Sequence, residues 1–172
     1  MSLPTHEEAS LHRLGDLITG IEQSHHAFTR DALDRITKLF DAMTDAGKPA
    51  PLALRRCFDE LQADLIPHLM KEERILFPYI IALESEPANP PHSCFGSIAN
   101  PIGMMAIEHD HVKTLLARQR ELSSNYAATS NAQIYALYAA LLALDDDLQQ
   151  HIHMEDDVLF PHALQLERQT AS

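Results

Sequence analysis

The chain has 172 residues, and 13 Lys and Arg against 25 Asp and Glu give it a formal net charge of −12. This acidic balance argues against nucleic-acid binding and against docking on an anionic membrane, because both need a basic surface. The hydrophobic share of 45%, the absence of a transmembrane-length apolar run or a secretion signal, and only two cysteines together predict a single cytoplasmic domain over residues 1–172.

Four helical blocks are predicted in chain order, because apolar residues recur three and four positions apart and only 5 residues are Gly. Short connections favour antiparallel neighbours, so the sequence predicts an all-α, up-down-up-down four-helix bundle. Pro67, Pro78 and Pro161 are expected to kink or end helices, and the residues before about 10 could form a separate arm. The blocks cover roughly residues 10–43, 52–83, 103–122 and 132–165, with breaks at 44–51, 84–101 and 123–131.

An internal repeat relates the two halves of the chain. The segments DLIPHLMKEERILFP (64–78) and DLQQHIHMEDDVLFP (147–161) align without a gap at an offset of 151 − 68 = 83 residues. The same offset takes His26 to His109, so each half has a His followed 42 residues later (68 − 26 and 151 − 109) by His-x-x-x-Glu. The repeat predicts two helix hairpins, about 10–83 and 103–165, related by a pseudo-twofold axis and joined by a loop over 84–101.

The repeated polar residues predict a metal site in the core. A His and a Glu four positions apart share one helix face, and the apolar run after each Glu indicates that this face points inward. Burying such groups is costly unless a cation compensates them, and imidazole with carboxylate suits Fe, Zn, Mn or Ni. Twofold symmetry predicts two metals, with one Glu from each half bridging them and coordination positions left for O2 or NO. The predicted ligands are His26, His68, Glu72, His109, His151 and Glu155.

Several neighbouring residues are weighed as alternatives. His25 could replace His26 as a ligand if the first helix is rotated. Glu108 is expected to support a ligand or to be exposed, whereas Glu73 and Asp156 are expected to face solvent. The remaining predictions are surface positions for His6, His12, His92, His111, His153 and His162, a buried Cys57 and an exposed Cys94.

These segments resemble the hemerythrin-like (HHE) cation-binding domain, and within it the repair-of-iron-centres (RIC) di-iron proteins. The resemblance rests on SHHAF (24–28), HLMKEERILFP (68–78), IEHDHV (107–112) and HIHMEDDVLFP (151–161), and it covers about residues 10–165. It implies a hemerythrin-like bundle with a non-haem di-iron centre, in which Glu72 and Glu155 bridge two iron ions. Zinc and manganese also suit these ligands.

The resemblance implies a role in the nitrosative and oxidative stress response. The expected ligands are O2, NO or peroxide, which the centre would bind or reduce, and the expected partners are iron–sulfur proteins that receive iron for cluster repair. RIC proteins usually carry a further His late in the first long helix, where this chain has Gly47; Asp41, Met43, Asp45 or water could take its place. They often carry an N-terminal cysteine-bearing domain, whose absence here weakens the expectation of repair relative to simple ligand binding.

Two other functions use the same residues. One is a non-enzymatic O2 or NO sensor or carrier. The other is a bundle whose site is structural or filled with zinc. The sequence does not decide whether the protein is an enzyme, and it predicts no oligomeric state.

Overall fold

A computed structural model describes residues 13–45, 51–86 and 92–170. Within these ranges the secondary structure is helical, and three of the four long segments contain a π-helical stretch. The first segment is α2 (Leu14–Gly20), η1 (Ile21–His26) and α3 (Ala27–Asp45); the second is α4 (Leu52–Lys71), η2 (Glu72–Leu76) and α5 (Phe77–Ser85); the third is α6 (Ala99–Leu122); and the fourth is α7 (Ala132–Met154), η3 (Glu155–Leu159) and α8 (Phe160–Thr170).

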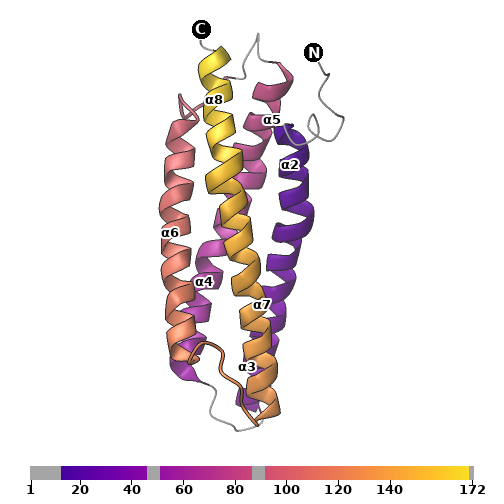
Figure 1. Ribbon diagram of the computed structural model, residues 1–172, viewed down its shortest axis with the longest axis vertical. Helices are drawn as coiled ribbons and strands as arrows, with labels where there is room; N and C mark the ends of the chain where they lie inside the picture. The colour runs from indigo at the N-terminus through magenta and orange to yellow at the C-terminus, as the bar shows by residue number, and fades with distance from the viewer. Residues whose placement is uncertain (1–12, 46–50, 87–91, 171–172) are drawn as a thin grey trace, which may run out of the picture.

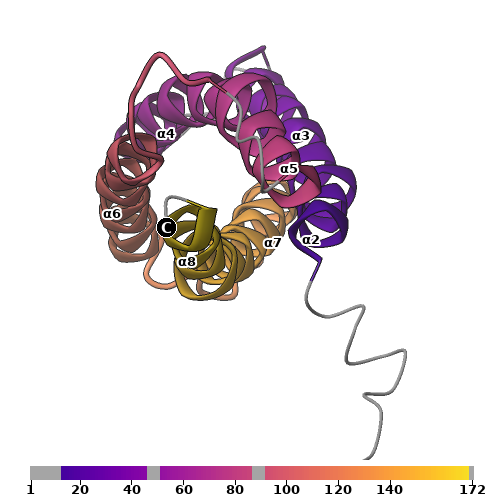
Figure 2. The ribbon, with the colours of Figure 1, turned by 90° about the horizontal axis from the view of Figure 1, so that it is seen from above.

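The four segments run alternately up and down and close into a ring (Figures 1 and 2). α4 packs against α6, α3 against α7, and α2 against α5, so each segment lies beside the next and the fourth lies beside the first. This arrangement confirms the predicted all-α, up-down-up-down bundle. No described helix is both long and apolar enough to cross a membrane.

The helix ends differ from the prediction at the prolines. α6 begins at Ala99, inside the predicted loop, because Pro101 falls in its first turn, where a missing N–H leaves no helix bond unmade. The helices also continue past Pro78 and Pro161, since each proline occupies the first turn that follows a π-helical stretch. The predicted N-terminal arm and residues 46–50 lie outside the described residues.

Two apolar clusters fill the bundle and lie on either side of a polar layer. Phe40 belongs to one cluster and Phe77 to the other. In α6, His109 separates Met105 of one cluster from Val112 of the other. The other three segments also place their buried His or Glu residues between the two clusters, so the polar layer crosses the middle of the core.

Candidate metal centre

All six predicted ligands lie in this polar layer, and every one is at most 3% exposed. They come from all four segments of the bundle. His26 ends η1, His68 lies in α4, Glu72 begins η2, His109 lies in α6, His151 lies in α7, and Glu155 begins η3.

The π-helical stretches coincide with the layer. His26 is the last residue of η1, and Glu72 and Glu155 are the first residues of η2 and η3. A π turn inserts an extra residue into the helix, and such turns occur frequently at functional sites. α6 supplies only His109 and contains no such stretch. These turns were not predicted from the sequence, although the same Leu-Phe-Pro run ends the motif in both halves.

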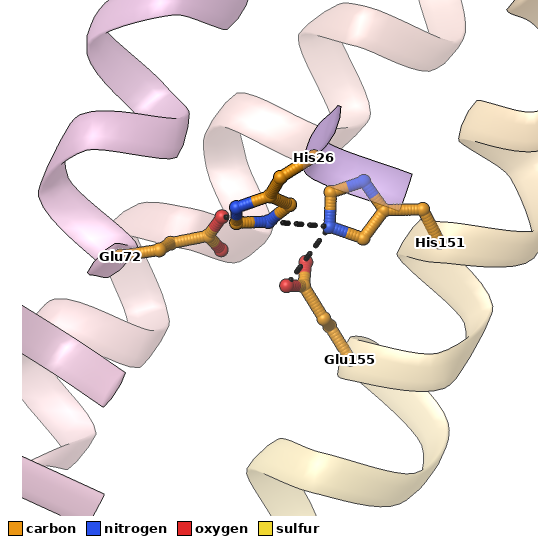
Figure 3. Close-up of side chains that lie close together, drawn as sticks. All are labelled: His26, Glu72, His151 and Glu155. Carbon is orange, nitrogen blue, oxygen red and sulfur yellow. Dashed lines mark hydrogen bonds and ion pairs between the residues drawn. The ribbon is translucent and has the colours of Figure 1, made fainter. Parts of the chain in front are cut away.

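The ligand atoms form two groups that share both glutamates. We call the group of His26 and His151 the first position (Figure 3), and the group of His68 and His109 the second position. Within each group the ligand atoms lie within 4.8 Å of one another.

Each glutamate reaches both positions with different oxygens. Glu72 places Oε2 3.4 Å from His26 Nε2 and Oε1 3.3 Å from His68 Nε2. Glu155 places Oε1 3.0 Å from His151 Nε2 and Oε2 3.2 Å from His109 Nε2. A carboxylate in this orientation can bridge two cations.

Three of the four histidines form a hydrogen bond to a carboxylate through Nδ1, the ring nitrogen that is not in the ligand group. In each pair the His Nδ1 lies 2.8 Å from a carboxylate oxygen, and that carboxylate also binds a Lys or Arg at the surface. The three arrangements are His26–Glu73–Arg30, His68–Glu108–Lys71 and His109–Asp156–Lys113. The prediction that Glu73 and Asp156 simply face solvent was therefore wrong, whereas Glu108 has the expected supporting contact.

These contacts determine which ring atoms are free to bind a cation. A carboxylate accepts a hydrogen bond from Nδ1–H, so the Nε2 atom of the same neutral ring presents a lone pair. The Nε2 atoms of His68 and His109 lie only 3.1 Å apart, and those of His26 and His151 lie 3.2 Å apart. The carboxylate oxygens of Glu72 and Glu155 are buried and receive no well-aligned hydrogen bond from a described residue. Converging acceptors of this kind fit a cation, and the donor set suits iron, manganese or zinc.

Three of the predicted ligands, His26, His68 and His109, have raised pKa values in the absence of metal. Burial alone would lower the pKa of His109, but the hydrogen bond to Asp156 and the nearby charge of Glu155 outweigh burial and raise it from 6.5 to about 9. Burial alone would also lower the pKa values of His26 and His68, but the nearby Glu72 outweighs burial and raises both. A metal must therefore displace protons from this layer when it binds.

The supporting carboxylates are held in their charged form. Burial alone would raise the pKa values of Glu73, Glu108 and Asp156, but the adjacent histidines and surface cations lower all three. They remain acceptors for the histidine Nδ1–H groups at neutral pH.

The alternative ligands lie elsewhere. His25 belongs to neither group; its Nδ1 lies 2.9 Å from Asp147 Oδ1, and its ring stacks on His151. Asp41 forms an ion pair with Arg55, and Met43 is buried in an apolar cluster.

Asp41 and Met43 are too distant from the six residues to take the place of the additional family His. Met43 is 17 residues beyond His26 (43 − 26) on continuous helix, which is about 25 Å along the axis. Gly47 and the side chain of Asp45 lie outside the described residues.

The described surface histidines and the cysteines lie as expected, whereas His6 and His12 lie outside the described residues. His111 contacts Asp64 and His153 contacts Asp157, and these side chains are exposed. Cys57 is buried and Cys94 is exposed.

Comparison with known proteins assigns the chain to a family. Residues 16–163 match the hemerythrin HHE cation binding domain, and the chain belongs to that family. It is 30% identical over 153 residues to the iron-sulfur cluster repair protein DnrN of Neisseria gonorrhoeae, a match that covers 87% of this chain and 91% of that protein.

Two further relatives are longer than this chain. It is 35% identical over 156 residues to the iron-sulfur cluster repair protein YtfE of Edwardsiella ictaluri (strain 93-146), and 34% identical over 159 residues to YtfE of Escherichia coli O157:H7. Each match covers 88% of this chain and 66% of the relative. These relatives confirm the resemblance to the RIC branch.

Proposed function

We propose that the six buried residues bind two iron ions. His26 and His151 hold one ion, His68 and His109 hold the other, and Glu72 and Glu155 bridge them. The observation that carries this proposal is the convergence of unpaired acceptor atoms in two groups with two shared carboxylates. When bound, iron supplies Fe(II)/Fe(III) exchange and coordination positions for a small ligand.

The protein restricts what can reach the centre. Apolar clusters above and below the layer exclude bulk water, so the site suits NO, O2 or peroxide better than a large substrate. A cavity of about 300 Å³ opens between α4 and α6, and His68 itself forms part of its wall beside Lys71, Ile107 and His111. This cavity provides a route for small molecules and for iron.

We further propose that the chain acts in iron–sulfur cluster repair during nitrosative or oxidative stress, and that iron–sulfur proteins are its partners. The names of the DnrN and YtfE relatives support this role. The supporting carboxylates serve it by keeping the histidines oriented while iron enters and leaves.

The first test measures iron per chain after anaerobic reconstitution. We expect two iron ions in the unaltered chain and almost none in the double variant Glu72→Gln, Glu155→Gln. Asp145→Asn is a matched control, because it also replaces a buried carboxylate with an amide but lies outside both ligand groups. Retention of both irons by the double variant would refute the site.

The second test measures repair directly. A [4Fe–4S] enzyme inactivated with NO is incubated with the iron-loaded chain, and recovery of its activity is followed. The controls are an equal amount of free Fe²⁺ and the zinc-loaded chain. Recovery that is no faster than with free Fe²⁺ would reject repair while leaving metal binding intact.

A further inference from the structure

The ligand layer departs from its own twofold symmetry at one histidine. Glu108 and Lys71 support His68, and the offset of 83 residues relates His68 to His151. The same offset relates Glu108 to residue 25 (108 − 83) and Lys71 to residue 154 (71 + 83). These positions hold His25 and Met154, so neither the carboxylate nor the cation is repeated behind His151.

The contacts around His151 reflect the presence of His25 and Met154 in place of a carboxylate and a cation. His151 Nδ1 is buried, and no described residue forms a hydrogen bond with it. His25 stacks on the ring instead, with centroids 5.6 Å apart, and its Nδ1 pairs with Asp147. Met154 packs against the neighbouring apolar cluster, where the symmetry-related lysine binds a carboxylate.

A carboxylate behind a ligand histidine fixes the ring and makes its Nε2 a stronger donor. Loss of such a partner typically reduces metal affinity 10- to 100-fold. At the second position both histidines have this support, from Glu108 and Asp156. At the first position only His26 has it, from Glu73.

We propose that the two metal positions are inequivalent: the position of His68 and His109 fills first, and the position of His26 and His151 binds its metal about 10- to 100-fold more weakly. The inference rests on the proposed metal site. It also predicts that the first position releases its metal first when a chelator competes.

The test is an anaerobic titration with Fe²⁺ in competition with a chromophoric chelator, which gives the two dissociation constants. In the unaltered chain they should differ about 10- to 100-fold. The double variant His25→Glu, Met154→Lys restores the missing pair, so both constants should become equal at the tight value. The opposite variant, Glu108→His with Lys71→Met, should make them equal at the weak value.

A matched control is Asp34→Asn, which changes an exposed carboxylate in α3 that pairs with Lys38 and contacts none of the six predicted ligands or their supporting residues. It should leave both constants unchanged. Thermal melts of the metal-free variants report whether each is folded, and the two double variants act in opposite directions, so a general loss of stability cannot produce both results.

The outcomes separate this inference from the proposed function. Two equal dissociation constants in the unaltered chain, or a ratio that neither double variant changes, would overturn the inequivalence and leave the di-iron site standing. Failure to bind metal at either position would overturn both.

Discussion

The bundle buries Asp145 at one place and the pair Glu72 and Glu155 at another. The negative charges at the two places are compensated in different ways. Asp145 in α7 is 1% exposed and accepts hydrogen bonds from Arg120 at 2.5 and 2.6 Å, from the Tyr126 hydroxyl at 2.9 Å and from Gln149 at 2.7 Å. Glu72 and Glu155 are equally buried, but their oxygens face histidine Nε2 atoms and receive no well-aligned hydrogen bond from a described residue.

This difference distinguishes Asp145, a carboxylate with a structural role, from the two glutamates that we propose bind a cation. Protein donors satisfy Asp145, which ties α7 to the end of α6 and to the turn that follows it. Three residues of that turn, including Tyr126, have left-handed φ angles between 52° and 58°, a conformation that costs energy for side chains other than glycine. The bond from Tyr126 to Asp145 holds this turn in place, whereas the proposed metal would compensate the glutamates of the ligand layer.

The largest expected effect comes from removing a shared carboxylate. Because each oxygen of Glu155 faces a different position, Glu155→Ala should abolish binding at both. His151→Ala removes a ligand from the first position alone and should leave one metal at the second. Metal analysis of the purified variants checks both outcomes. If Glu155→Ala kept one metal ion per chain, this carboxylate would serve only one position.

Removing Asp145 should instead reduce stability and leave metal content unchanged. Asp145→Ala strands Arg120 and Tyr126, and we expect a loss of about 3 kcal/mol. For a chain of this size that corresponds to a fall of about 6–12 °C in the melting temperature. Tyr126→Phe deletes one of the bonds and should cost only about 1 kcal/mol. Loss of metal from Asp145→Ala would show that the two places are coupled.

The sequence predicted the ligand layer because a repeat with one constant offset carries it. His26 and His109, and the two His-x-x-x-Glu motifs, share this offset, and the apolar run after each Glu indicates that the shared face points inward. The four-helix architecture followed from the same repeat and from the short breaks between blocks.

The supporting carboxylates could not be predicted in the same way. Successive helix residues point about 100° apart, so the residue after an inward ligand faces the seam with a neighbouring helix. Glu73 and Asp156 lie in such seams, beside His26 and His109. Which ligand they meet depends on how the helices pack.

Asp145 was also missed, although a signal was present. It lies one turn after Leu141 and beside Leu144, in register with core leucines. A charged residue in that register predicts a buried polar cluster, but two of its partners, Arg120 and Tyr126, come from α6 and the turn, and their approach depends on tertiary structure.

Metal removal should destabilise the bundle by slightly less than the loss of Asp145. Free metal at 100 times the dissociation constant of one position stabilises the folded state by about 2.7 kcal/mol. Chelation should therefore lower the melting temperature of the unaltered chain by about 5–10 °C, and Asp145→Asn should show the same shift from a lower starting point. Glu155→Ala should show no shift, and an equal shift in that variant would place the stabilising metal outside the ligand layer.

A pH dependence of the metal-free protein is also expected. The pKa of His109 is raised in the folded state from 6.5 to about 9. Its protonated form therefore contributes stability that is fully present below pH 6.5 and is lost as the pH rises through about 9. A shift of this size corresponds to about 3 kcal/mol at most, so thermal melts of the metal-free chain should show a melting temperature that falls by up to about 10 °C over this interval.

Loading with metal should reverse the sign of this dependence. Protons compete with the metal for Nε2, so metal affinity rises with pH over the interval in which the metal-free fold loses stability. Asp156→Asn removes the charge that supports the protonated His109, and it should flatten the fall in the metal-free protein. Asp34→Asn, which changes an exposed carboxylate in α3, should leave it unchanged. A metal-free melting temperature that rises between pH 6.5 and 9 would contradict the hydrogen bonding assigned to the ligand layer.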